Sequence, residues 1–246
     1  RFRDKPITYD IKSAEKSVKR EVINSWSEVS KELGQFKLKV KSGELREGEV
    51  VGVLGENGIG KTTFARLLTG ELTPDEGEID SELKISYKPQ YIKPERNMLV
   101  KDLLKNNPLY NKFEHYFRHL QLKPLMNKSL KQLSGGELQR VSITHCLTQE
   151  ADIYLLDEPS AHLDVEQRIH AAKALKEITR AMKKNAIVID HDLMFIDYVS
   201  ERLIVFTGEP AMKGLAQGPF RMREGMNHFL QELNLTIRRD EATNRP

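Results

Sequence analysis

The residues with the clearest chemical use form a glycine-rich loop, Gly55-Glu56-Asn57-Gly58-Ile59-Gly60-Lys61-Thr62-Thr63. It follows an apolar run over 49–54 and leads into 64–68, so the pattern G-x-x-x-x-G-K-[ST] stands between a strand and a helix. Glycines let the backbone pass close to phosphates, and the loop N–H groups and the helix dipole attract an anion. A chance glycine-rich turn is the alternative. The context predicts a nucleoside triphosphate site, with Lys61 on the β/γ-phosphates and Thr62 on Mg²⁺.

Two carboxylates end a second apolar run. Residues 153–156 are followed by Asp157 and Glu158, which indicates a buried parallel strand that delivers acids at its carboxyl end. Asp157 suits Mg²⁺, usually through water, and Glu158 is placed to reach an attacking water as general base. His191 follows another buried strand over 186–190. A histidine there is ordinarily structural, but its companions favour a functional role.

The stretch Ser134-Gly135-Gly136-Glu137 opens a helix, with Ser134 as N-cap and Glu137 completing a capping box. The Ser134 hydroxyl and the glycine N–H groups at this helix N-terminus form a second anion site. Asp164 caps a longer helix. Its expected core-facing positions are Val165, Ile169, Ala172, Leu175, Ile178 and Met182.

Strands that alternate with helices must position these groups, which predicts an α/β fold with a mainly parallel sheet and right-handed crossovers. Residues 36–40 alternate apolar and polar as a half-exposed strand. A small helical subdomain is expected at about 91–145, inserted into the core. Residues 1–30 are charge-rich and are expected to form a linker or hinge segment, with an arm lying on a phosphate backbone as the alternative. Residues 31–208 are expected to form the nucleotide-binding domain, and 209–246 a hinge-like tail with a short amphipathic helix.

The composition is that of a soluble globular protein: 246 residues, 39% hydrophobic, 30% charged and a net charge of +3. No apolar stretch approaches the length of a membrane span and no secretory signal opens the chain, so no membrane is expected. The single cysteine, Cys146, fits a reducing compartment and predicts the cytoplasm. Arg1 instead of Met in first place predicts a fragment of a longer chain.

The glycine-rich loop, Gln90, the stretch 134–137, the acids at 157–158 and His191, taken in this order, resemble an ATP-binding cassette (ABC) ATPase. The resemblance implies a P-loop (RecA-like) fold with a small antiparallel β subdomain. It makes Gln90 a residue that senses Mg²⁺ and the water, and His191 a γ-phosphate contact. Lys61 joins them among the catalytic residues, and Thr62, Gln90 and Asp157 among the metal ligands.

In ABC proteins the signature turn at 134–137 completes the ATP site of a second nucleotide-binding domain, and Asp164 lies at that interface. One glycine loop of this type occurs here, so the resemblance implies a partner domain. Adenine usually stacks on an aromatic residue upstream of the loop. Phe36 and Trp26 are the candidates; Phe36 is favoured because its strand start resembles that position, and either could belong to the core.

A finer resemblance connects the chain with subfamily E, the ribosome-recycling ATPases or RNase L inhibitors, in their second nucleotide-binding domain. It lies in the stretches 87–92, 133–140, 155–167 and 206–210, and in the tail 222–240, which is similar to a C-terminal hinge. The lysine-rich composition is similar to that of archaeal members. The iron–sulfur domain and the first nucleotide-binding domain are then expected elsewhere in the full-length protein; Cys146 alone cannot hold a cluster.

This resemblance implies ATP-driven splitting of ribosomes into subunits after termination or stalling. The expected partners are the small subunit with its rRNA, and a release factor or a Pelota-like factor. The ATPase subunit of a membrane transporter is the alternative, because both classes use the same ATP chemistry. A mainly structural, ATP-clamped binding module is a third interpretation and would require an idle Glu158.

Overall fold

A computed structural model describes residues 20–79, 82–90, 98–105 and 107–243, with side chains as far as residue 232. Eight strands form one sheet in the order β2-β3-β10-β9-β5-β8-β7-β6. Strands β5, β6, β7, β8 and β9 run parallel to one another. The bounds of these five are Val50–Leu54, Ile85–Lys88, Ile153–Asp157, Asn185–Ile189 and Arg202–Glu209. This confirms the predicted mainly parallel sheet.

The remaining strands form the antiparallel part of the fold. β2 (Val29–Leu33) pairs antiparallel with β3 (Phe36–Val40), and β1 (Val22–Trp26) pairs antiparallel with β4 (Gly43–Arg46) in a separate two-stranded sheet. The predicted linker over residues 1–30 is therefore wrong for its last part, since 22–26 and 29–30 are strand. Long-range pairing decides this, because β1 pairs with β4 and β2 with β3. Residues 1–19 lie outside the described part.

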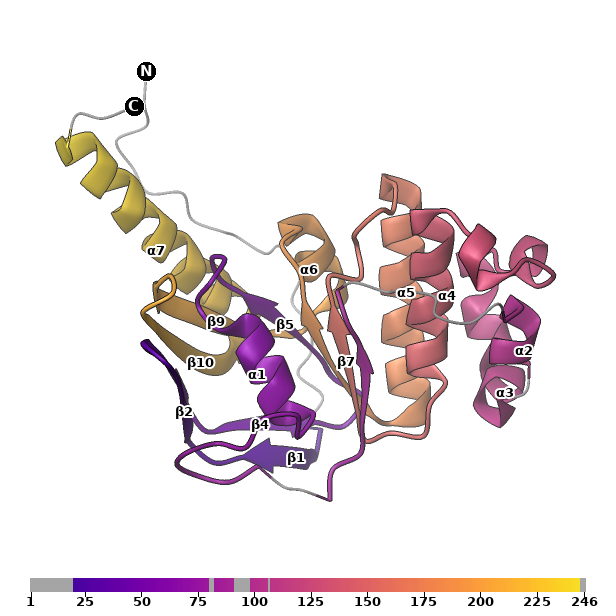
Figure 1. The fold of residues 1–246 in the computed structure, drawn as a ribbon, viewed down its shortest axis with the longest axis horizontal. Helices are drawn as coiled ribbons and strands as arrows, with labels where there is room; N and C mark the ends of the chain where they lie inside the picture. The colour runs from indigo at the N-terminus through magenta and orange to yellow at the C-terminus, as the bar shows by residue number, and fades with distance from the viewer. Residues whose placement is uncertain (1–19, 80–81, 91–97, 106, 244–246) are drawn as a thin grey trace.

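Helices cover both faces of the large sheet (Figure 1). On one face α1 (Lys61–Leu68) buries Phe64 among Val51, Val53 and Phe206. The other face is covered by α4 (Gly135–Leu147), α5 (Val165–Met182) and α6 (Leu193–Val199). All residues of β5, β7 and β8 are buried, as expected for parallel strands that are covered on both faces.

The helical part beside α4 is built from α2 (Val100–Leu104) and α3 (Pro108–Phe117), followed by 3₁₀ turns at 118–120, 123–125 and 130–132. Figure 1 shows this group at the side of the molecule away from β2. Asn107 caps α3, and its side chain accepts a hydrogen bond from the N–H of Leu109. The first residues of the predicted helical subdomain, 91–97, lie outside the described part of the chain.

The C-terminal part is more closely integrated than predicted. β10 (Lys213–Arg221) lies between β9 and β3 in the large sheet, so the segment 209–246 is not a separate hinge in its first part. α7 (Met222–Thr243) follows, and its buried Met222 and Met226 pack against the main core. Strand β10 was not predicted from the sequence, because glycines and a proline interrupt its alternation of apolar and polar residues.

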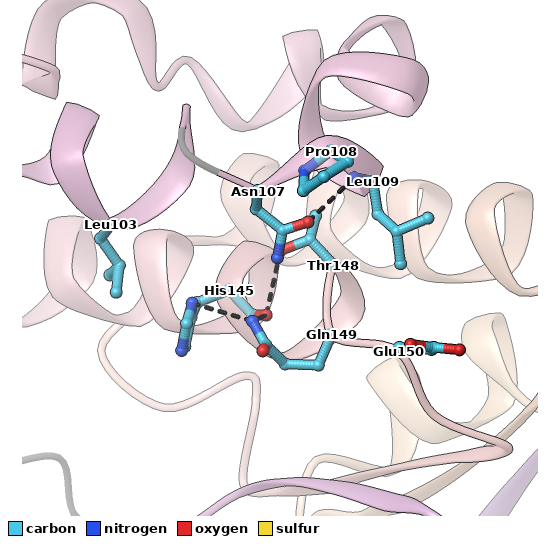
Figure 2. A pocket seen from close by; sticks show the side chains of 8 residues that line it. All are labelled: Leu103, Asn107, Pro108, Leu109, His145, Thr148, Gln149 and Glu150. Carbon is cyan, nitrogen blue, oxygen red and sulfur yellow. Dashed lines mark hydrogen bonds between the residues drawn. The ribbon is translucent and has the colours of Figure 1, made fainter.

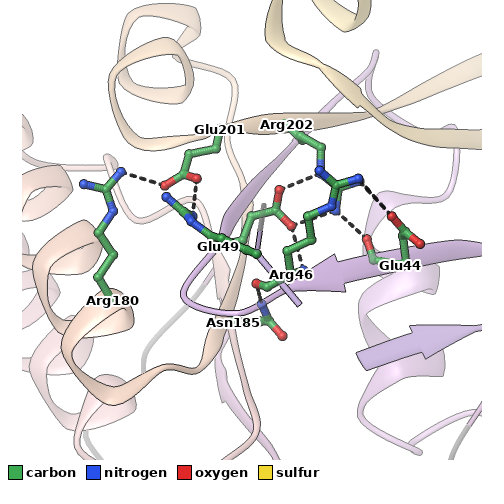
Figure 3. A network of polar contacts seen from close by, with 8 residues as sticks. Glu44, Arg46, Glu49, Arg180, Asn185, Glu201 and Arg202 are labelled. Atoms are coloured by element: carbon green, nitrogen blue, oxygen red, sulfur yellow. Dashed lines mark hydrogen bonds and ion pairs between the residues drawn. The ribbon is translucent and has the colours of Figure 1, made fainter. Parts of the chain in front are cut away.

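An ion-pair network joins the starts of three strands (Figure 3). Arg202 begins β9 and binds both carboxylate oxygens of Glu49, the residue before β5, while its Nη2 donates to the Glu44 carbonyl of β4. Glu49 is only 3% exposed. Farther out, Glu201 binds Arg180 of α5. The network anchors the strand that leads into the glycine-rich loop.

In helix α5 two of the positions predicted to face the core are exposed. Asp164 caps it as predicted, and its carboxylate accepts the N–H of Gln167. However, Val165 is 71% and Ile169 47% exposed, so these two apolar positions do not face the core. The buried positions of α5 begin farther along the helix, at Ala171, Ala172 and Leu175.

Candidate functional site

The glycine-rich loop connects buried β5 to α1. Gly58 and Gly60 adopt left-handed conformations with φ of 78° and 101°, which explains glycine at both places. A Cβ on Gly60 would lie 2.9 Å from the Phe36 ring, so this glycine also permits close packing of loop and strand. Ile59 is buried and fixes the loop from inside.

Lys61 is 6% exposed, and its amine donates two hydrogen bonds of 2.7 Å to the carbonyls of Gly55 and Glu56. Burial lowers the pKa of Lys61 to about 8, although Asp157 and Glu158 act in the opposite direction. The amine thus lies inside the loop that it follows, close to two carboxylates. This placement suits the neutralisation of a phosphate group.

Asp157 ends β7 and is 5% exposed. Burial and, next, the Glu158 charge raise the pKa of this carboxyl above its usual range, while Lys88 and Lys61 act against the shift. The hydroxyl of Tyr87 lies 3.5 Å from Asp157 Oδ2. A buried carboxylate beside a second acid favours a bound cation.

Glu158 turns out of the strand with a φ of +46°, and its N–H donates to the Ile189 carbonyl at 2.7 Å. Its Oε1 lies 3.2 Å from Nε2 of His191, which follows β8. The general-base candidate and the predicted phosphate contact are therefore direct neighbours.

These groups surround one cavity of about 250 Å³ at the carboxyl ends of β5, β7 and β8. It is lined by Phe36, Asn57, Gly58, Gly60, Lys61, Thr62, Thr63, Gln90, Asp157, Glu158, Ile189, His191 and Ala211. Gly55, Glu56 and Ile59 belong to the same loop but do not line the cavity. Trp26 is buried elsewhere, where its indole donates to the Lys41 carbonyl and its ring lies near Phe64. Of the two aromatic candidates, Phe36 is the one at the cavity.

The predicted signature residues do not line this cavity. Ser134 caps α4 and Glu137 completes the capping box, as predicted from sequence. Glu137 also binds Lys128 at 2.8 Å, and this contact together with the Ser134 N–H lowers the pKa of Glu137 to about 2. Gly135 and Gly136 pack against His162, while Asp164 follows at the N-terminus of α5. Ser134, Gly135 and Asp164 are exposed, which leaves this surface accessible.

Sequence analysis missed two buried residues that hold the acids. Lys88 ends β6 and donates to the carbonyls of Asp157 at 2.7 Å and Pro89 at 3.1 Å. Gln139 of α4 donates to the Glu158 carbonyl at 2.6 Å. A lysine two residues before Gln90, at the end of a half-buried strand, was an available signal. Gln139 lies in the stretch 133–140 that carries the family resemblance, but its contact with Glu158 could not be foreseen, because the two residues are 19 positions apart.

The larger cavities lie elsewhere. One of about 600 Å³ opens between α2, α3 and the end of α4, and it is drawn in Figure 2. Its polar groups are mostly engaged: Asn107 caps α3, and the Gln149 amide lies 3.2 Å from Nδ1 of His145. It lacks the acids and the glycine loop, so its size does not make it the nucleotide site.

The glycine-rich loop, the two acids at the end of β7, His191 after β8 and the parallel sheet define an ABC-type nucleotide-binding domain. The family model described as ABC transporter matches residues 38–161. An uncharacterized ABC transporter ATP-binding protein of Methanocaldococcus jannaschii is 47% identical over 253 residues, which cover 100% of this chain and 42% of that protein. ABC transporter E family member 3 of Arabidopsis thaliana is 41% identical over 170 residues, 65% of this chain and 94% of that protein. The chain belongs to the ABC family and, within it, to the E family.

Two solved structures agree with this assignment. A model of ribosome-bound archaeal Pelota and ABCE1 matches with a TM-score of 0.84 at 46% identity, over 94% of this chain and 40% of that one. A complex of the archaeal ribosomal stalk protein aP1 with the archaeal ribosome recycling factor aABCE1 matches with a TM-score of 0.82 at 43% identity, over 94% and 46%. The chain spans about two fifths of the curated relatives that it matches over its whole length.

Proposed function

We propose that this domain binds Mg-ATP and hydrolyses it. The observation that carries the proposal is the single cavity that joins Lys61, Thr62, Gln90, Asp157, Glu158 and His191 beside Phe36. Phe36 would stack on adenine, and the loop from Gly55 to Thr63 would cradle the phosphates. The nucleotide-binding character follows from the family; the individual roles are the proposal.

The oxygen atoms that the cavity offers fit a magnesium ion. Thr62, Gln90 and Asp157 offer the hard oxygen donors that Mg²⁺ prefers, and burial of Asp157 beside Glu158 makes a cation favourable there. Mg²⁺ is bound through few protein groups plus phosphates and water, so a protein cage is not required. When bound, the ion would neutralise developing charge on the phosphates.

Hydrolysis would use the remaining groups as follows. Glu158 accepts a proton from a water molecule as the water oxygen bonds to the γ-phosphorus, and the bond to the β-γ bridging oxygen breaks to release ADP. His191, 3.2 Å from Glu158, orients this carboxylate and contacts the γ-phosphate. Lys61 binds the β/γ-phosphates, and Gln90 orients the water.

We further propose that the surface formed by Ser134, Gly135, Gly136, Glu137 and Asp164 completes the ATP site of a second nucleotide-binding domain. These residues lie outside the domain's own cavity, and the N–H groups of Gly135 and Gly136 lie at the N-terminus of α4, where an anion is favoured. The domain's own cavity would in turn be closed by the signature surface of its partner.

For the full-length protein we propose ATP-driven ribosome recycling in the cytoplasm, with the small ribosomal subunit and its rRNA, a release factor or a Pelota-like factor as partners. The proposal is supported by relatives described as a ribosome recycling factor and as ribosome-bound ABCE1 with Pelota, both above 40% identity. A transporter subunit has the same cassette chemistry. In the part of the chain that the structure covers, no helix combines the length and apolar character needed to cross a membrane.

The test uses the full-length protein with Glu158→Gln, which keeps the side-chain shape but removes the base. We expect hydrolysis to fall by about 10²–10⁴-fold, with ATP binding retained. The ATP-loaded variant is then incubated with ribosomal subunits and membrane vesicles, and the fractions are separated by sedimentation. ATP-dependent recovery with the small subunit supports recycling. Recovery with vesicles alone would support the transporter instead, and unchanged hydrolysis would refute the assignment of Glu158.

A further inference from the structure

The backbone of Glu158 is held in a conformation that a glutamate does not adopt readily. Its φ is +46°, in the left-handed region, which is uncommon for a residue with a Cβ. Such a conformation persists only where surrounding contacts fix it. The contacts around this one peptide therefore decide where the carboxylate points.

Strand β8 and helix α4 hold the backbone of Glu158, one at its N–H group and the other at its carbonyl. The Glu158 N–H donates to the Ile189 carbonyl of β8 at 2.7 Å. The Glu158 carbonyl accepts the side-chain amide of Gln139 at 2.6 Å, and more weakly the N–H of Ala161 at 3.3 Å. Gln139 is 3% exposed, so no water replaces its amide easily.

Gln139 belongs to the second turn of α4, directly after the signature turn. The same helix start also touches the loop that follows Glu158: a Cβ on Gly136 would lie 2.7 Å from the His162 carbonyl, and one on Gly135 would lie 3.2 Å from the His162 ring. His162 is itself in a left-handed conformation, with φ of 61°. The N-terminal part of α4 and the loop 158–162 are thus packed as one unit.

We propose that Gln139 is a positioning residue for hydrolysis, which fixes the peptide of Glu158 through its carbonyl and so directs the carboxylate into the cavity. It also joins the signature turn, which we assign to the ATP site of a second domain, to the acid of this domain's own site. A shift of α4 when the signature turn engages nucleotide would then be transmitted to Glu158. The inference rests on the proposed role of Glu158.

The experiment compares Gln139→Met with Thr144→Val in the full-length protein. Methionine has nearly the shape of glutamine but cannot donate. Thr144 is a buried residue of the same helix whose hydroxyl donates to the Arg140 carbonyl. We expect Gln139→Met to lower kcat at least tenfold, because a small misplacement of a catalytic group has a large effect on rate. Equilibrium ATP affinity and the melting temperature should stay near those of Thr144→Val.

A double variant separates positioning from a general structural effect. If Gln139 acts through Glu158, Gln139→Met adds no further loss in a Glu158→Gln background. An additional loss there, a kcat within twofold of the parent, or a parallel loss of ATP affinity would overturn the inference. If Gln139→Met does not fold, Gln139→Leu gives the same comparison, because leucine also has no donor. Unchanged hydrolysis by Glu158→Gln alone would instead contradict the proposed function.

Discussion

Replacement of Arg202 by Met tests how the start of β5 is held. Arg202 is 11% exposed and binds Glu49, whose side chain is 4% exposed, through two contacts, one of them 2.7 Å long. In the variant the Glu49 carboxylate stays buried, with the Arg46 N–H at 2.9 Å as its remaining hydrogen-bond partner among those described here. Breaking a buried pair from one side costs about 3–5 kcal/mol, because an uncompensated charge remains. That is a large part of the roughly 5–15 kcal/mol that stabilises a typical domain.

The assay is urea unfolding followed by circular dichroism, and Arg180→Met is the matched control. Arg180 pairs with Glu201 in the same network but is 49% exposed, so its loss should cost less than about 1 kcal/mol. The double variant Glu49→Leu/Arg202→Met should be more stable than Arg202→Met alone, since it leaves no buried charge. The reasoning fails if Arg202→Met costs no more than the control, or if the double variant is the least stable of the set.

Two further predictions concern the site. Burial lowers the pKa of Lys88 from its ordinary 10.5 to about 8. Between about pH 8 and 10.5 the unfolded chain therefore keeps a proton on Lys88 that the folded state has lost. Because the unfolded state binds more protons, the free energy of unfolding rises with pH in this range. Between about pH 7.5 and 9.5 the free energy of unfolding, measured with urea, should rise by roughly 2 kcal/mol more in the parent protein than in Lys88→Met. The same pH dependence in both proteins would contradict this. Phe36→Ala should weaken ATP binding roughly tenfold by the loss of stacking, measured by titration calorimetry. Trp26→Phe should leave the ATP affinity unchanged and lower the stability of the fold, because its indole bonds to the Lys41 carbonyl within the core. If Trp26→Phe weakened ATP binding and Phe36→Ala did not, Trp26 would be the adenine-stacking residue instead of Phe36.

Features that depend only on residues close together in the sequence were predictable. The glycine loop, the Ser134 capping box and the Asp164 cap each depend on residues within a few positions of one another, so their local chemistry is complete in the sequence. The order of buried strands and helices likewise gave the parallel sheet.

Features that depend on distant partners were not predictable. Strand β1 carries polar residues and becomes a strand only because β4 pairs with it. Exposure of Val165 could not follow from helical periodicity, which tells where apolar residues align but not where the packing partner ends. The contact of Gln139 with Glu158 was not predictable for the same reason, since it forms only when α4 packs beside the loop after β7.

The two adjacent acids show how a departure from regular structure builds the site. In a continued strand, successive side chains point to opposite faces of the sheet, so Asp157 and Glu158 would diverge. The left-handed turn at Glu158 breaks this alternation, and both carboxylates line the same cavity. Such a conformation costs of order 1–3 kcal/mol, which the hydrogen bonds from Gln139 and to Ile189 offset. The chemistry of the site therefore depends on contacts from α4 and β8 as directly as on the acids themselves.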